Sequence, residues 1–132
     1  MNRREFLAAA LAAELAAADT ALPMATLGKT GLRVTRITLG GAHMRFGTEE
    51  NAIRIIHRAL DLGINFFDSA AKYNDGQSDA CCGKAVSPAV RKNILLMSKA
   101  QLRTRDEAMA QLEGTLRLMK TDYWIYGSAT KS

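Results

Sequence analysis

Short apolar runs alternate along this chain with stretches whose apolar residues recur at helical spacing, and this alternation limits the fold more than any other feature. The expected strands are Val34–Leu39, Ile64–Phe67, Ile94–Met97 and Tyr123–Tyr126, and the expected helices cover about 48–62, 78–86 and 104–119. Strands that alternate with helices through short loops predict an α/β fold with a parallel sheet and right-handed crossovers. An open doubly wound sheet and a partial (β/α)8 TIM barrel both satisfy this pattern. A complete barrel needs roughly 250 residues, so four strands and three helices would be about its N-terminal half.

Turn and cap residues divide the chain at these boundaries. The glycines of 28–31 indicate a tight turn or small hairpin, and Gly63 is expected to stop the first helix. Thr48 can cap that helix, while 104–107 has the Thr and Glu of a capping box. We expect 127–132 to be a frayed polar tail. The apolar residues expected on the buried side of the last helix are Met109, Leu112, Leu116 and Met119.

The composition is that of a soluble globular protein, with 48% hydrophobic and 23% charged residues. The net charge of +5 comes from scattered basic residues, so it predicts a mild attraction to anions and no nucleic-acid partner. Cys81 and Cys82 are adjacent, and a disulfide between neighbours would be strained. No Cys/His spacing suits zinc, so we expect no metal site and two semi-buried thiols on a helix.

The first 22 residues resemble an export signal. Arg3 and Arg4 precede an apolar run, Phe6–Ala13, that is too short to span a bilayer. Paired arginines before such a run, with small residues and possible cleavage after Ala18, are typical of a twin-arginine signal of bacteria. Glu14 departs from that pattern. The sequence therefore predicts a periplasmic or otherwise exported protein with no membrane span, and the alternative is an alanine-rich helix on a cytoplasmic protein.

Three polar residues follow two of the expected strands at or near their ends. Asp68 comes directly after one strand, Tyr73 lies in the loop behind it, and Lys99 follows the next strand. In parallel α/β proteins reactive groups gather at the carboxyl ends of the strands. An ammonium near a phenol stabilises the phenolate, and a carboxylate can hold the ammonium in place. The triplet could therefore make Tyr73 a general acid toward a carbonyl oxygen. Taken singly, each has an ordinary structural explanation: Asp68 as a helix or turn cap, Tyr73 as a packing residue and Lys99 as a solvated cation.

Several separated segments, taken together and in order, resemble the aldo-keto reductase family over about residues 25–124. The segments that carry the resemblance are Leu27–Val34, Leu39–Gly41, Gly63–Ala70, Gly76–Asp79, Gly83–Ala85, Leu96–Lys99 and Leu112–Tyr123. Membership implies a (β/α)8 barrel and NADPH-dependent reduction of a small carbonyl substrate, an aldehyde or a ketone. The domain with this resemblance would be 23–132.

The resemblance also implies roles for individual residues. Asp68, Tyr73 and Lys99 match three members of the family's four-residue catalytic set. Gly41 and Ala42, with Asp68, lie where the family approaches the nicotinamide of its cofactor.

The sequence departs from the family near its end. A histidine is expected a few residues after Asp122-Tyr123, but no histidine follows His57, and neither His43 nor His57 matches it. The loss of agreement at about Trp124 suggests a truncated or frame-shifted copy of a longer reductase. Such a half-barrel would expose a sheet edge and could self-associate.

Three hypotheses follow. The chain is an aldo-keto reductase present as its N-terminal part, or a catalytically inactive fragment or binding module with the same half-barrel, or an unrelated doubly wound domain. The absence of a GxGxxG or P-loop motif argues against the third, because Gly40-Gly41 alone is not a phosphate loop.

Overall fold

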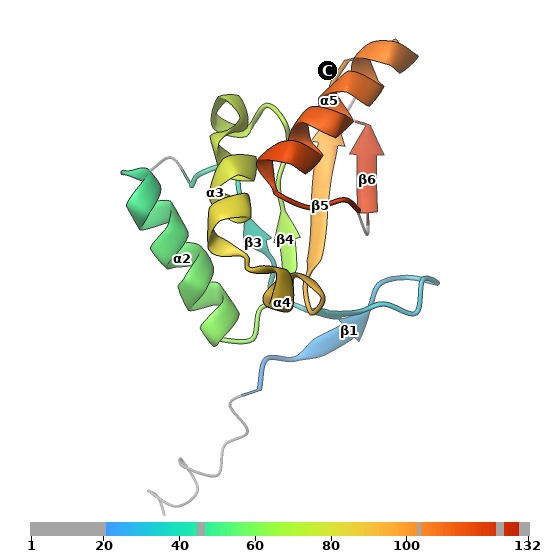
Figure 1. Ribbon diagram of the computed structural model, residues 1–132. Helices are drawn as coiled ribbons and strands as arrows, with labels where there is room; N and C mark the ends of the chain where they lie inside the picture. Colours follow the sequence, from blue (N-terminus) through green and yellow to red (C-terminus); the bar gives the residue numbers. More distant parts are fainter. Residues whose placement is uncertain (1–20, 45–46, 103, 124–125, 130–132) are drawn as a thin grey trace, which may run out of the picture.

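Four parallel strands form the central sheet in the computed structural model, which describes residues 21–44, 47–102, 104–123 and 126–129 (Figure 1). The strands are β3 (Leu39–Gly40), β4 (Phe66–Asp68), β5 (Leu95–Ala100) and β6 (Tyr126–Ala129), and they lie in the sheet in this order. Strand order follows chain order, so β3 and β6 are the edges of the described sheet. Nearly all of the expected export segment 1–22 lies outside the described residues.

The helices α2, α3 and α5 lie on the same side of this sheet (Figure 1). Their bounds are α2 (Glu49–Asp61), α3 (Gln77–Ala85) and α5 (Arg105–Leu118), with a short α4 (Pro88–Arg91) and a 3-10 turn, η1 (Tyr73–Gly76). A doubly wound sheet carries helices on both faces, whereas a barrel carries them all outside. The arrangement is therefore that of a barrel segment, and the described strands do not close into a ring. No described helix combines the length and the apolar character needed to cross a bilayer.

Alternation of side chains along β4 and β5 separates the core from the polar face. Phe67 and Leu96, 1% exposed each, belong to the apolar cluster formed with the helices. Because side chains alternate along a strand, Asp68 and Lys99 lie on the opposite face, away from the helices. The cluster is completed by residues of α2, α3 and the flanking segments, among them Ile56, Cys82 and Met119.

The hairpin expected around 28–31 is present, but the strand expected over Val34–Leu39 is wrong as a single element. The hairpin pairs β1 (Met24–Thr26) with β2 (Arg33–Thr35), and the chain then bends before β3 begins at Leu39. The Asn65 side chain explains the break, because it accepts from the Thr35 amide at 2.8 Å and donates to the Arg33 carbonyl at 2.9 Å. Those bonds hold β2 against the start of β4 rather than in line with β3.

The first helix begins and ends as predicted. The Thr48 hydroxyl accepts from the amide of Asn51, and Gly63 takes a left-handed φ of 82° just after the last turn. The following amide, of Ile64, donates to the Ala59 carbonyl at 2.9 Å. Ile64 therefore belongs to the helix ending, which is why the next strand begins at Phe66 and not at Ile64.

The later strands extend further toward the C-terminus than predicted. β5 continues past Met97, so Lys99 lies inside the strand, near its end, and not after it. The strand expected over Tyr123–Tyr126 is instead β6, and Gly127 belongs to that strand rather than to a frayed tail. Tyr123 is held elsewhere, because its carbonyl accepts from Arg91 at 2.9 Å. Residues 124–125 and 130–132 lie outside the described part.

The last helix has the predicted capping box at Thr104, but its buried side differs from the prediction. Met109 is 45% exposed, while Thr115 and Met119 are buried. Leu112 and Leu116, also expected there, are half-buried. Only the C-terminal half of α5 therefore packs closely on the rest of the fold.

Candidate active site

Asp68 and Lys99 meet because of the register between two neighbouring strands. Asp68 is the last residue of β4 and pairs with Met97 of β5. Lys99 stands two residues beyond Met97, on the same face of the sheet. The two charged side chains therefore lie side by side at the carboxyl ends of their strands, and they form an ion pair.

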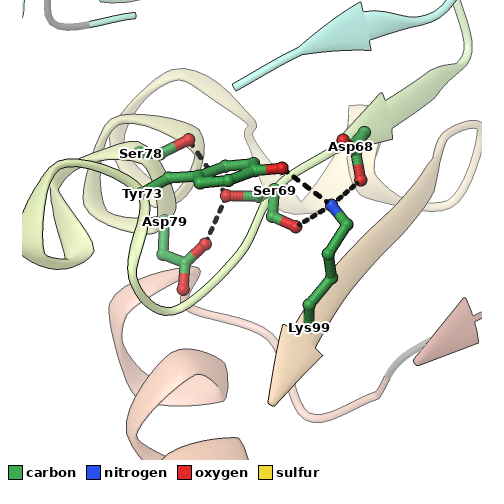
Figure 2. A network of polar contacts seen from close by, with 6 residues as sticks. All are labelled: Asp68, Ser69, Tyr73, Ser78, Asp79 and Lys99. Carbon is green, nitrogen blue, oxygen red and sulfur yellow. Dashed lines mark hydrogen bonds and ion pairs between the residues drawn. The ribbon is translucent and has the colours of Figure 1, made fainter. Parts of the chain in front are cut away.

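The Lys99 ammonium donates hydrogen bonds to three oxygen atoms (Figure 2). The ammonium bonds to the Asp68 carboxylate and to the Ser69 carbonyl, the latter at 2.9 Å. Its third partner is the Tyr73 hydroxyl oxygen, at 3.2 Å. An ammonium has three donors, so this geometry uses all of them. Since the Tyr73 oxygen accepts from Lys99, its own O–H is left to donate to another group.

Tyr73 reaches Lys99 through a tightly turned loop. The Tyr73 amide donates to the Ala70 carbonyl at 2.9 Å, and η1 starts at this residue. Asn74 and Asp75 then take left-handed φ values of 53° and 54°. Non-glycine residues rarely adopt this conformation, although Asn and Asp tolerate it best. Strained backbone of this kind is concentrated at functional sites, and here it directly follows Tyr73, whose hydroxyl reaches Lys99.

A second set of polar side chains lies beside the Lys99 cluster, which is formed by Asp68, Tyr73 and Lys99 (Figure 2). The hydroxyl oxygens of Ser69 and Ser78 are 2.9 Å apart, and the Ser69 hydroxyl bonds to the Asp79 carboxyl at 2.5 Å. All three side chains are buried, with Asp79 0% exposed. This set could not be predicted from the sequence, because a carboxylate such as Asp79 is common in the first turn of a helix, where the helix dipole stabilises it.

Burial raises the pKa of Asp79 above its ordinary value of 3.8, and the hydroxyls of Ser69 and Thr115 and the ammonium of Lys99 oppose the rise. The Thr115 hydroxyl donates its proton to the Gln111 carbonyl at 3.1 Å, so it acts on Asp79 as a nearby dipole. Among the described residues, Asp79 Oδ2 has no hydrogen-bond partner. A buried oxygen without a partner costs about 1–3 kcal/mol.

Gly41 and Ala42 lie beside the same cluster. The Gly41 amide donates to the Asp68 carbonyl at 2.7 Å. A Cβ at position 41 would overlap the Ser78 hydroxyl and lie 2.9 Å from the Asp68 carbonyl oxygen, so this close approach requires glycine. The Ala42 carbonyl accepts from the Asn74 side chain at 3.4 Å. The loop after β3 is thereby joined to the loop that carries Tyr73.

Other candidate features lie apart from this cluster. His57 is on α2, exposed, with its Nε2 3.1 Å from the Ala85 carbonyl oxygen, and His43 is exposed in the loop after β3. Among the described residues, no three His, Cys, Asp or Glu side chains are placed to hold a metal ion.

Two hollows also lie elsewhere. A groove of about 820 Å³ lies between α4, α5 and the loop 120–123, and a pocket of about 160 Å³ lies between the starts of α2 and α3. Neither is lined by Asp68, Tyr73 or Lys99. The cluster therefore lies on the helix-free face of the sheet and not inside either hollow.

Comparison with known families accounts for this arrangement. The profile described as "Aldo/keto reductase family" matches residues 36–124. The chain belongs to the aldo/keto reductase family. The match includes the loop after β3, the Lys99 cluster and α5, whereas the β1–β2 hairpin and β6 lie outside it.

Curated aldo-keto reductases are about one-third identical to the chain over the stretches that align. Aldo-keto reductase dtxS3 of Metarhizium robertsii is 37% identical over 90 residues, which is 61% of this chain and 24% of the relative. Aldo-keto reductase YhdN of Bacillus subtilis is 32% identical over 114 residues, 74% of this chain and 34% of the relative. The chain thus spans about a quarter to a third of the curated relatives it matches.

Solved aldo-keto reductase structures resemble the chain in fold. Aldo-keto reductase AKR11C1 from Bacillus halodurans superposes with a TM-score of 0.73 and 26% identity, over 82% of this chain and 40% of that one. An aldo-keto reductase from Klebsiella pneumoniae in complex with NADPH gives a TM-score of 0.66 and 25% identity, over 73% of this chain and 35% of that one. The predicted fold class, part of a (β/α)8 barrel, is confirmed.

Proposed function

We propose that this chain carries the proton-donating centre of an NADPH-dependent reductase of aldehydes or ketones. The observation that carries the proposal is the bonding of the Lys99 ammonium, which donates to the Tyr73 oxygen and leaves the Tyr73 O–H free. A carbonyl oxygen placed against that O–H would be bonded to a donor that is already supported by a cation.

Asp68 and Lys99 have separate tasks in this scheme. Asp68 pairs with the Lys99 ammonium, whose side chain is only 16% exposed, and fixes it beneath the phenol. As Tyr73 gives its proton to the substrate oxygen, negative charge develops on the phenol oxygen, 3.2 Å from the ammonium. A charge placed where charge develops stabilises the transition state more than the ground state, so Lys99 promotes the transfer.

The residues beside the cluster suit the nicotinamide end of NADPH, which supplies a hydride to the carbonyl carbon when bound. Gly41, Ala42 and Asp68 would hold that end, because Asp68 pairs with Lys99, the Gly41 amide donates to the Asp68 carbonyl, and the Ala42 carbonyl accepts from Asn74, the residue after Tyr73. Support comes from relatives: codeinone reductase 1-3 of Papaver somniferum, named as NADPH-dependent, is 31% identical over 112 residues.

A comparison of two tyrosine variants tests the proposal. NADPH oxidation with an aromatic aldehyde is followed at 340 nm for the wild type, Tyr73→Phe and Tyr123→Phe. Loss of a general acid lowers the rate by about 10²–10⁴-fold, so Tyr73→Phe should fall by that factor. Tyr123, 41% exposed and 3.5 Å from the Arg91 carbonyl, lies away from the cluster, so its variant should match the wild type. A wild type with no turnover would instead support the inactive-fragment or binding-module hypothesis.

Export and self-association are also proposals. We base the first on the Arg3-Arg4 pair and the apolar run behind it, and the second on the edge strands β3 and β6. A fusion of residues 1–22 to a reporter protein should reach the periplasm in a twin-arginine-competent bacterium and stay in the cytoplasm after Arg3→Lys with Arg4→Lys. Sedimentation that shows only monomer would exclude self-association.

A further inference from the structure

We propose that Asp79 is a positioning residue for Lys99, acting through Ser69; this inference rests on the proposed function, in which Lys99 supports the proton donor. The chain of contacts runs from the Asp79 carboxyl to the Ser69 hydroxyl and from the Ser69 carbonyl to the Lys99 ammonium (Figure 2).

Ser69 is held at three points, and two of them involve this chain of contacts. Its amide donates to the Met97 carbonyl of β5 at 2.8 Å, its hydroxyl bonds to Asp79 at 2.5 Å, and its carbonyl accepts from Lys99 at 2.9 Å. A residue fixed at its amide and its side chain cannot rotate its peptide carbonyl freely. The direction of the Ser69 carbonyl, and so one of the bonds that orient the ammonium, depends on Asp79.

Asp79 does not serve its own helix in the usual way. It lies in the first turn of α3, where a carboxylate often bonds to the helix-start amides, and the N-cap residue of α3, Gly76, has no side chain that could cap them. The Asp79 carboxyl points instead to Ser69, in the loop after β4. A fully buried carboxyl with one oxygen unpartnered among the described residues is unfavourable for stability, and such groups are concentrated at functional sites.

The hydrogen bond, and not a negative charge, is the element that positions Ser69. Burial raises the pKa of Asp79, which favours its neutral form, while the facing Lys99 ammonium favours the charged form. The other titratable group that faces Asp79 is Cys82 of α3, whose own pKa is raised to about 12 by burial, so it stays neutral. A neutral carboxyl can donate to Ser69 and a charged one can accept from it, so the link exists in both states.

Competitive acetylation of lysines, read by mass spectrometry, tests the inference without requiring turnover. In the wild type Lys99 should react more slowly than the half-exposed Lys84, whose partner is Glu49 of α2. Asp79→Ala should raise the reactivity of Lys99 by about tenfold, the strength of one hydrogen bond to a charged group. Asp79→Asn keeps a hydrogen-bonding side chain and should preserve the protection of Lys99.

A third variant, Ser69→Ala, breaks the same link with a smaller change and should raise the reactivity of Lys99 in the same way. Lys84 lies on α3 with Asp79, so it reports loosening of that helix. Unchanged Lys99 reactivity in both Asp79→Ala and Ser69→Ala would overturn the inference. An equal increase in the acetylation rates of Lys84 and Lys99 would also overturn it, because it would indicate general loosening of α3. Because labelling does not depend on reduction of a carbonyl, an inactive wild type would contradict the proposed function and leave this result standing.

A pH series gives an independent check on the burial of Asp79. A native pKa above 3.8 means that the favourable contribution of Asp79 is fully present below pH 3.8 and is lost as pH rises through the native pKa. Asp79→Asn has no such loss, so its stability relative to the wild type should rise as pH increases from 4 toward 8. Urea unfolding at each pH measures this, and a difference that stays flat would contradict a buried, perturbed carboxyl.

Discussion

Two glycines in helices predict opposite effects of the same substitution. Gly83 lies in α3 where that helix crosses the end of α5, and a Cβ there would overlap the Leu118 carbonyl oxygen. The same Cβ would be 2.9 Å from the Cα and carbonyl carbon of Met119. Gly114 lies in α5, and the nearest atom to a Cβ there is a guanidinium nitrogen of Arg117 at 3.9 Å. Gly83→Ala therefore meets backbone, whereas Gly114→Ala meets only the end of a flexible side chain.

The expected magnitudes follow from these contacts. Carbon atoms in contact prefer separations of about 3.5–4.0 Å, so Gly83→Ala must push the two helices apart by on the order of 1 Å. Overpacking of this kind costs about 1–3 kcal/mol. The contacting atoms here belong to the main chain and cannot move by a change of rotamer, so we expect a cost of about 3 kcal/mol. Replacing glycine inside a helix returns about 1 kcal/mol. Gly83→Ala should therefore lower the free energy of unfolding by about 2 kcal/mol, while Gly114→Ala should raise it by about 1.

Urea unfolding followed by far-ultraviolet circular dichroism measures both changes. Each variant adds one methyl group to the wild type. The difference between their free energies of unfolding, about 3 kcal/mol, therefore comes from the helix crossing alone. If Gly83→Ala were as stable as Gly114→Ala, the close approach of α3 to the end of α5 would be refuted. The crossing holds the helix that carries Asp79, so Gly83→Ala should also raise the reactivity of Lys84 toward acetylation.

Two further predictions concern buried polar groups. Arg91→Met should lower the free energy of unfolding by about 2–4 kcal/mol, because it removes the donor of the Ile94 carbonyl and the nearer of the two donors of the Tyr123 carbonyl. Arg105→Met, at an exposed side chain, should change it by less than about 0.5 kcal/mol. Equal effects in urea unfolding would contradict the structural role of Arg91. Cys81 and Cys82 are buried, and the pKa of each thiol is raised by burial, that of Cys82 to about 12, so a thiol reagent at pH 8 should label them only after unfolding. Rapid labelling of the folded protein would show that α3 opens more readily than its packing implies.

The geometry of the Lys99 cluster could be predicted from sequence because strand ends leave little freedom. Asp68 and Tyr73 are close in the chain, and Lys99 lies near the end of the neighbouring parallel strand. The three groups therefore meet at the carboxyl ends of the strands. Their proposed roles stay predictions. The position of Lys99 inside β5 was missed, because apolar character ends at Met97 while the backbone pairing continues to Ala100.

Elements set by tertiary contacts could not be predicted. The residues Tyr123–Tyr126 have strand-like side chains, but Arg91 holds the Tyr123 carbonyl and β5 pairs with 126–129 instead. Met109 has the spacing of a core residue, yet it belongs to the half of α5 that is not closely packed. The role of Asp79 could not be predicted, because the sequence places it in the first turn of a helix but does not show that its carboxyl bonds to Ser69.

The alternation of β5 also limits how this strand can change. If one residue were inserted between Leu95 and Lys99, the ammonium would emerge among Cys82 and the other apolar side chains of the helix layer, where an unpaired charge is prohibitively unfavourable. If two were inserted, the ammonium would return to the correct face but shift by about 6.6 Å, beyond reach of the phenol. Length variation should therefore be tolerated in the surrounding loops while the span from Leu95 to Lys99 keeps a constant residue count.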